Sequence, residues 1–170
     1  MSSLRLLNET TVSSAVSSIT VDNLFTSDFD IYKVTITAEG VSVTGSNLRF
    51  VNSAGAIVVS SQYDKAMQIA RANASISELK STDATELQYF GGVYDPEGGN
   101  MVYYIFNPTN SSSYTFIMSQ GSSSDGGNGR AYKQIGILTE LSSITGLNFV
   151  FNDANVDVAS IKTYGISNET

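Results

Sequence analysis

The sequence contains neither histidine nor cysteine. Histidine is the usual general base at neutral pH and a common transition-metal ligand, and cysteine is needed for thiolate catalysis and disulfides. Their absence removes Ser–His and Cys–His nucleophilic pairs, thiolate metal sites and any disulfide framework. The composition therefore gives no indication of a redox compartment.

Charged residues are also scarce. They make up 15% of the 170 residues, and acidic residues outnumber basic ones to give a net charge of −7. Nucleic acids and anionic membranes are both bound through clustered lysine and arginine. We therefore expect no nucleic-acid partner and no membrane insertion. Serine, threonine, asparagine and glycine are abundant instead, and they favour turns and β structure over helix.

Long apolar runs are missing as well. No run approaches the roughly 20 residues of a membrane-spanning helix. The N-terminus, Met-Ser-Ser-Leu-Arg-Leu-Leu-Asn-Glu, lacks the apolar core and cleavage site of a signal peptide. These features predict a protein that is made in a cytoplasm and stays there or is assembled there into something larger.

What is present is a series of short extended runs. The clearest is Ile31–Ala38, where Tyr32, Val34 and Ile36 alternate with polar residues, as in a strand with one wet face. These runs, separated by Gly/Ser/Asn turns, predict about eight to ten short strands in an all-β sandwich or barrel, formed by a single domain. The other runs are 19–25, 48–51, 57–59, 67–70, 87–93, 101–106, 114–118, 131–139, 144–151 and 156–166.

Several segments carry more specific predictions. Met101–Phe106 is apolar on both faces, which is typical of a strand buried in the middle of a sandwich. We expect it to form a hairpin with Tyr114–Met118. Residues 63–80 fit both a helix and a strand, and we favour a strand over Met67–Ala70 with a helical turn near Ser77–Lys80. Ser122–Gly129 is predicted to be a flexible loop.

The two ends of the chain have distinct patterns. Residues 1–16 form either a fraying terminus or an arm that packs on a neighbouring subunit through Leu4, Leu6 and Leu7, and residues 17–168 form the domain. Ile144–Ile166 contains two extended runs around a polar break, which predicts a hairpin that closes a sheet. Bulky residues on both faces of its second run, Tyr164 among them, predict a strand covered on both sides.

Catalytic and metal-binding patterns are weak. The carboxylate pairs Asp28/Asp30 and Asp95/Glu97 have glycosidase-like chemistry, but pairs arise by chance among 16 acidic residues. The segment Gly126–Gly129 lacks the lysine and the following helix of a phosphate-binding loop. We therefore expect no enzyme, no cofactor and no resident metal. One weak candidate for a site that binds a hard cation does exist. Its oxygen donors would be Asp125, Asn128, Asp153 and Asp157.

Aromatic residues cluster in one part of the chain. Two interpretations apply to this cluster: core aromatics of a sandwich, which we favour, or a surface that stacks on sugar rings or contacts another subunit. The absence of tryptophan, the best stacking ring, weighs against sugar binding. The candidate residues of this surface are Tyr89, Phe90, Tyr94, Tyr103 and Tyr104, with Tyr164 and the N-terminal leucines.

Several of these segments resemble small virion proteins of tailed bacteriophages, a group frequent in phages of marine bacteria and cyanobacteria. The resemblance covers nearly the whole chain after about residue 15, and its motifs are structural. It implies a β-sandwich of jelly-roll type, present in copies on the particle as a capsid decoration, tail or fibre-associated subunit. The segments are Tyr63-Asp64-Lys65-Ala66, Ser75–Ser81, Met101–Pro108, Ser111–Phe116, Gly129–Gly136, Ile144–Leu147 and Tyr164-Gly165-Ile166.

Two functions are therefore expected. The first is a virion structural protein that acts through contacts with itself, as a homo-oligomer such as a trimer, and with other virion proteins. The alternative is a module of the particle that binds a host receptor or a surface glycan. An enzyme such as a glycan depolymerase is the least favoured class, because no catalytic constellation is present.

Overall fold

The computed structural model describes residues 2–40, 46–88, 98–125, 127–152 and 155–168. Twelve strands form two antiparallel sheets, and no helix occurs in these ranges. The described residues accordingly include no helix long and apolar enough to cross a membrane. The strands are β1 (Ser2–Val12), β2 (Ser18–Val21), β3 (Ile31–Gly40), β4 (Ser46–Asn52), β5 (Tyr63–Arg71), β6 (Ala74–Ala84), β7 (Leu87–Gln88), β8 (Gly99–Phe106), β9 (Thr115–Asp125), β10 (Asn128–Leu138), β11 (Ile144–Phe151) and β12 (Val156–Asn168).

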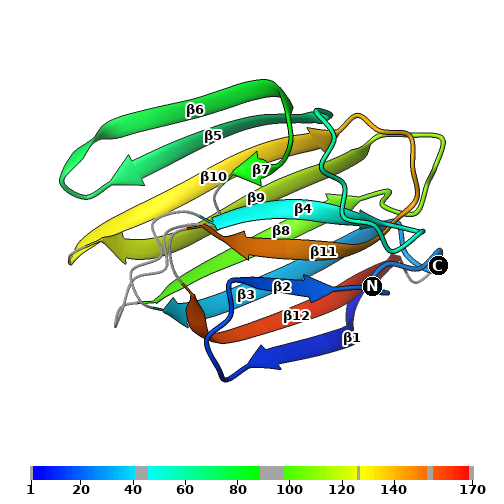
Figure 1. The fold of residues 1–170 in the computed structure, drawn as a ribbon, viewed down its shortest axis with the longest axis horizontal. Helices are drawn as coiled ribbons and strands as arrows, with labels where there is room; N and C mark the ends of the chain where they lie inside the picture. The colour runs from blue at the N-terminus through cyan, green and yellow to red at the C-terminus, as the bar shows by residue number, and fades with distance from the viewer. Residues whose placement is uncertain (1, 41–45, 89–97, 126, 153–154, 169–170) are drawn as a thin grey trace.

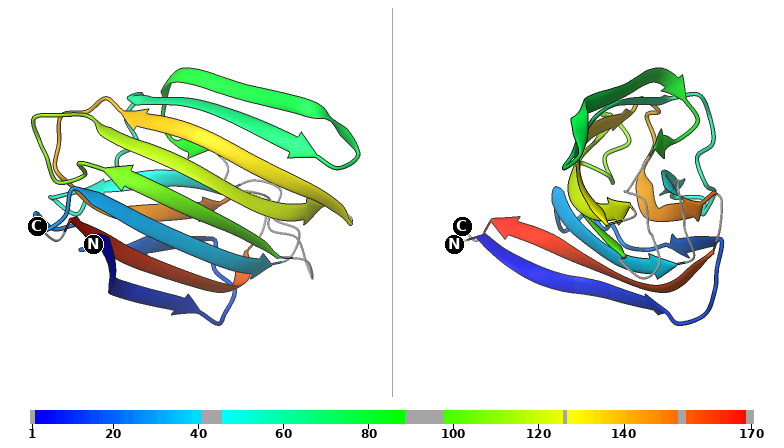
Figure 2. Two further views of the ribbon diagram at one scale, coloured as in Figure 1. Left: turned by 180° about the vertical axis from the view of Figure 1, so that it is seen from behind. Right: turned by 90° about the vertical axis from the view of Figure 1, so that its left-hand side faces the viewer.

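The sheets have eight and four strands and pack face to face (Figures 1 and 2). The large sheet has the order β1-β12-β3-β8-β9-β10-β5-β6, and the small sheet has the order β2-β11-β4-β7. The chain alternates between the sheets through β1, β2, β3 and β4, and again through β7, β8, β11 and β12. Those eight strands form the two four-stranded sheets of a jelly roll. The all-β sandwich predicted from the sequence is therefore confirmed, with the jelly-roll type that the resemblance implies, although twelve strands are present where about eight to ten were expected.

Two hairpins widen the large sheet beyond the jelly roll. One is β5–β6, inserted between β4 and β7, and the other is β9–β10, inserted between β8 and β11. They pair with each other through β10 and β5, from Arg130 opposite Arg71 to Leu138 opposite Tyr63. The large sheet is consequently twice as wide as the small sheet that covers it.

The core lies between the sheets and comes from the alternation of each strand. Tyr32, Val34 and Ile36 of β3 are fully buried, as their period-two spacing predicts. Across the interface, the ring of Tyr103 on β8 lies 6.2 Å from that of Phe149 on β11, centroid to centroid. Other buried side chains are Ile19, Val21, Leu48, Phe50, Met67, Ile69, Met101, Ile105, Ile117, Leu138, Leu147 and Ile161.

Two buried tyrosines also anchor loops to the core through their hydroxyl groups. The Tyr63 hydroxyl accepts a hydrogen bond from the Phe50 N–H and donates one to the Val58 carbonyl, both at 3.0 Å. The Tyr32 hydroxyl accepts from the Thr26 N–H at 2.8 Å and donates to the Thr26 carbonyl. Each hydroxyl thus satisfies backbone groups at the end of a rigid, packed side chain.

The predicted closing hairpin is wrong. β11 lies between β2 and β4 in the small sheet, whereas β12 lies between β1 and β3 in the large sheet. The connection between them crosses from one sheet to the other, as a jelly roll requires. A short polar break between two extended runs has the same pattern whether the chain turns back within a sheet or passes to the opposite one.

Two local predictions are also wrong for a shared reason. Ser77–Lys80 belongs to strand β6 and forms no helical turn, and most of Ser122–Gly129 belongs to the ends of β9 and β10. Both segments are rich in residues with low strand propensity. Pairing with a neighbouring strand overrides that propensity, because the ladder satisfies the backbone groups of each added residue.

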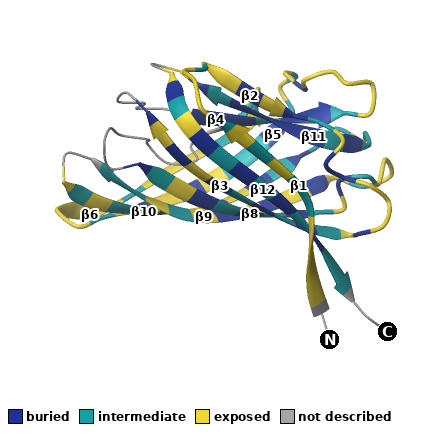
Figure 3. Ribbon diagram, turned by 90° about the horizontal axis from the view of Figure 1, so that it is seen from below, coloured by how far each residue is buried: buried dark blue, intermediate teal, exposed yellow. Residues whose placement is uncertain are grey.

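The N-terminal segment is part of the domain. β1 pairs with β12 from Ser2 opposite Asn168 to Val12 opposite Ala159, so the proposed boundary at residue 16 is not a structural one. Figures 2 and 3 show the end of this two-stranded ribbon, which carries both termini, projecting from the body of the sandwich. Leu4 and Leu6 are 54% and 51% exposed there, whereas Leu7 is half-buried and packs against the core.

These leucines give a first prediction. Leu4→Ser and Leu6→Ser should change the free energy of unfolding by less than about 0.5 kcal/mol, because both side chains are largely in water. Leu7→Ser should cost about 1 kcal/mol or more, since it removes a partly buried contact with the core. Urea unfolding at low protein concentration measures all three. Equal losses at the three positions would contradict the placement of β1.

The buried tyrosines give a second prediction, at alkaline pH. Burial raises the pKa of Tyr63 and of Tyr103 well above the ordinary value near 10, and the hydrogen bond from Phe50 offsets this only partly for Tyr63. Above pH 10 the unfolded chain releases these protons while the folded chain keeps them. Stability should therefore fall by about 1.4 kcal/mol per pH unit for each tyrosine.

The variant Tyr103→Phe isolates one of these groups. Its free energy of unfolding should fall less steeply than that of the wild type between about pH 10 and 11.5, by the amount due to one tyrosine. Tyr114→Phe, at a tyrosine that is 43% exposed, is the control and should keep the wild-type slope. Identical slopes for Tyr103→Phe and the wild type would contradict the proposed cause.

Candidate functional site

The outer face of the large sheet carries apolar side chains that the small sheet does not cover. Residues directly opposite each other on neighbouring strands point to the same face. Phe106 of β8 lies opposite Phe116 of β9, which lies opposite Ile137 of β10. In the other direction the same row continues through β3 and β12 to β1, with Ile31, Ile166 and Leu4.

A second row runs beside the first. Tyr104 lies opposite Met118, and Met118 lies opposite Ile135. Lys33 of β3 separates Tyr104 from the remaining members of this row, which are Tyr164 of β12 and Leu6 of β1. We call the eleven apolar residues of the two rows the apolar band.

The apolar band is extensive, and its eleven side chains are either exposed or half-buried. Phe116, Met118 and Ile135 are 41%, 47% and 53% exposed. With strands spaced about 4.8 Å apart, a row across six strands is about 24 Å long. Soluble monomers rarely expose a contiguous apolar surface of this extent unless it has a binding role. At the β10 end of the band, a groove of about 450 Å³ lies over β5, β6 and β10. Its lining includes Ala66 and two members of the band, Ile135 and Ile137.

Charge is distributed unevenly over the molecule. Eight of the nine basic residues lie on strands of the large sheet, together with seven of the sixteen acidic ones, so these strands carry +1. The described residues outside these strands carry −4, from Asp22, Asp28, Asp30, Glu86 and Glu140 against Arg49. Repulsion between copies is therefore weakest when they meet through the large sheet.

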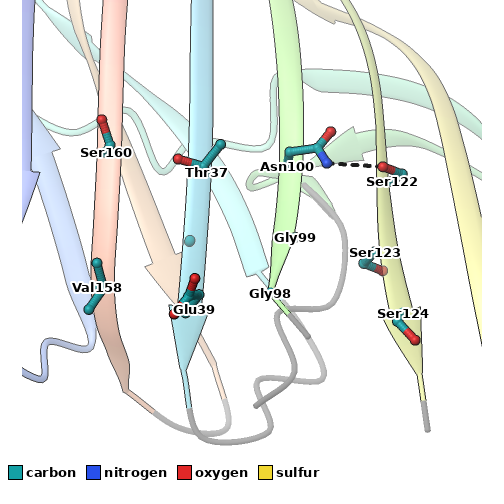
Figure 4. Close-up of a pocket in the computed structure, with 11 residues that line it drawn as sticks. Thr37, Glu39, Gly98, Gly99, Asn100, Ser122, Ser123, Ser124, Val158 and Ser160 are labelled. Atoms are coloured by element: carbon teal, nitrogen blue, oxygen red, sulfur yellow. Dashed lines mark hydrogen bonds between the residues drawn. The ribbon is translucent and has the colours of Figure 1, made fainter. Parts of the chain in front are cut away.

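The other end of the same outer face is polar (Figure 4). Ser160, Thr37, Asn100 and Ser122 lie side by side across β12, β3, β8 and β9. They line a shallow depression of about 410 Å³, the polar depression, whose further lining includes Glu39, Gly98, Gly99, Ser123, Ser124 and Val158. The Asn100 side-chain amide donates a hydrogen bond to the Ser122 hydroxyl at 3.0 Å.

A second group of polar residues lies on the small sheet and on strands next to it. Arg49 donates from Nε and Nη2 to Glu86 Oε2 at 3.0 and 2.6 Å, and Asn47 donates to Glu86 Oε1 at 2.6 Å. The Lys65 ammonium donates to the Glu86 carbonyl at 3.0 Å, and burial lowers the pKa of Lys65. These residues hydrogen-bond to one another, so the group ties β4 and β5 to the segment that leads into β7.

The residues predicted as a binding surface are divided by the structure. Tyr104, Tyr164, Leu4 and Leu6 belong to the apolar band, and Leu7 is half-buried. Tyr103 is 2% exposed between the sheets, so its inclusion in a surface was wrong. It alternates with Tyr104 along β8, and only one of two consecutive strand residues can face outward. Tyr89, Phe90 and Tyr94 lie outside the described residues.

Sequence reasoning missed most of the apolar band. Its missed members are Ile31, Phe106, Phe116, Met118, Ile135, Ile137 and Ile166. A signal was present, because strands such as Met101–Phe106 are apolar on both faces. This pattern predicts a strand that is buried on both faces. In the structure only the inner face of β8 is buried, and Val102, Tyr104 and Phe106 on its outer face are half-exposed.

No acidic metal-binding cluster is assembled in the described ranges. They contain no group of three or more acidic side chains placed to hold a metal ion. Asp28 and Asp30 are exposed at the loop before β3. Of the weak cation set, Asp153 lies outside the described residues, as do Asp95 and Glu97 of the second carboxylate pair.

No protein-family model matches the chain, and no curated protein matches it. Among solved structures, a protein of unknown function from Shewanella oneidensis MR-1 is similar at 7% identity, over 99% of this chain and 81% of that one, with a TM-score of 0.23. A chain in the structure of infectious bursal disease virus, Gx strain, is similar at 12% identity, over 99% of this chain and 38% of that one, with a TM-score of 0.18.

Proposed function

We propose that this protein is a structural subunit of a bacteriophage particle and that copies of it associate through the outer face of the large sheet. The observation that carries this proposal is the apolar band. Covering its exposed side chains removes apolar surface from water, which stabilises association by about 25 cal/mol for each Å² buried, before the cost of association.

A second copy is the partner that fits the band best. The strands of the large sheet carry +1 while the other described residues carry −4, so two copies that meet through their large sheets keep these acidic residues apart. Lys33 lies within the band, where it can pair with an acidic group at the rim of a neighbour. A closed homo-oligomer is the usual outcome when one surface is shared by all copies.

The particle context is supported by different observations. The chain resembles small tailed-phage virion proteins in the segments given above, and jelly rolls are common among viral coat domains. Fold alone does not assign function, so the argument depends on the band. A subunit of this kind needs polar contacts and apolar burial, which are the chemistries that the outer face offers.

The assembly is tested by the mass in solution. Multi-angle light scattering should give the wild type a multiple of 18.1 kDa. Met118→Lys and Ile135→Lys should both shift the protein toward 18.1 kDa, because each places a charge inside the contact. Leu141→Lys is the control, since Leu141 is 60% exposed outside the band. A wild type that is monomeric at every concentration, or variants that assemble as it does, would contradict the assembly.

The particle role is tested separately. Particles purified by density gradient from a culture that produces the protein should contain it in many copies, measured by quantitative mass spectrometry. Met118→Lys should lower its copy number per particle, whereas Leu141→Lys should not. Recovery of the wild-type protein only in the soluble fraction would exclude a virion role and leave the assembly result unchanged.

A further inference from the structure

We propose that the polar depression binds a neutral saccharide, such as the terminal residue of a surface glycan. This is a binding function beyond the structural role proposed above, and it is located away from Tyr104 and Tyr164, two of the tyrosines that the sequence suggested.

The side chains of the polar depression match the hydrogen bonding of sugars. Hydroxyl groups of Thr37 and Ser160 both donate and accept, and the Asn100 side chain offers a carbonyl oxygen and N–H groups. Sugar hydroxyls have the same dual character, so each can find a partner in either sense. The Glu39 carboxylate adds a strong acceptor for hydroxyl donors. The described lining of the depression includes no lysine or arginine, which disfavours phosphate, sulfate and acidic sugars.

These groups are held in place and available. Thr37 lies opposite both Ser160 and Asn100 in the ladder, so three rigid strands position the three side chains. The hydroxyls of Thr37 and Ser160 form no hydrogen bond with any described residue. Asn100 is oriented by its hydrogen bond to Ser122 and keeps its oxygen and a second N–H for a ligand (Figure 4). Preorganised polar groups lower the cost of ordering on binding.

Gly98 and Gly99 line one side of the depression and, having no side chains, leave that side open. Gly98 has a φ of +66°, and a Cβ there would lie 3.2 Å from the Ala38 carbonyl oxygen and from Glu39 Cγ. A side chain at this position would strain the backbone and crowd the carboxylate. With glycine, the start of β8 stays open beside Glu39. The depression, at about 410 Å³, has the volume of a small-molecule site.

The described residues that line the depression include no aromatic ring, so we expect a single site to bind weakly. An assembled particle subunit presents several such sites at once. Linked sites raise apparent affinity without any new contact, provided that their spacing matches the ligands. Binding at one site requires no assembly, whereas tight attachment to a glycan-covered surface does depend on the proposed oligomer.

Saturation-transfer NMR tests the site, because it works for weak ligands and for assembled protein. The probes are methyl glycosides of glucose, galactose, mannose and N-acetylglucosamine, with sialic acid as an anionic comparison. At least one neutral probe should receive saturation, and sialic acid should not. Asn100→Ala and Thr37→Val should weaken that binding about fivefold each, the usual effect of one lost hydrogen bond. Glu39→Gln should weaken it further, since it removes a charged acceptor.

Ser112→Ala is the matched control, because Ser112 is an exposed serine in the β8–β9 turn at the other end of the sheet. It should bind as the wild type does. The proposal is overturned by no transfer to any neutral probe, by a preference for sialic acid, or by binding that Asn100→Ala and Thr37→Val leave unchanged. Met118→Lys should still bind, so loss of assembly and loss of the glycan site give different results.

Discussion

The organising constraint of this protein is that a four-stranded sheet covers only one face of an eight-stranded sheet. Contacts such as that between the rings of Tyr103 and Phe149 bury the inner face, and the two hairpins added to the jelly roll double the width of the layer that must be covered. The outer face has no covering layer among the described residues. Its composition therefore determines what the molecule can contact.

That face has two chemically different halves along the strand direction. The row containing Tyr104 and Met118 is four residues along β8 and β9 from the row containing Asn100 and Ser122. At about 3.3 Å per residue the two rows are about 13 Å apart. The same strands consequently carry the apolar band near one end and the polar depression near the other, and a contact centred on the band can leave the depression at its rim, open to solvent.

The fold class was accessible from the sequence, whereas the position of each strand was not. Period-two patterns such as that of β3 reveal a half-buried strand locally, since alternation depends only on neighbours along the chain. Whether β11 and β12 share a sheet depends on β2, β4, β1 and β3, which are distant in sequence. The serine-rich end of β9 pairs with the start of β10 for the same reason, so composition predicted a loop where tertiary context forms a ladder.

The candidate sites were less accessible because both arise from register. Thr37, Asn100 and Ser160 are unremarkable singly, and a slip of one residue in β8 would turn Asn100 inward and Met101 outward. The same slip would exchange Tyr103 for Tyr104. Local sequence thus identified the right pair of tyrosines without showing which one faces outward.

The buried partner of Tyr103 on β11 resolves this, because a ring held against Phe149 commits every alternate residue of β8 to the core and the others to the outer face. The inner packing of one strand therefore sets both the apolar band and the polar depression.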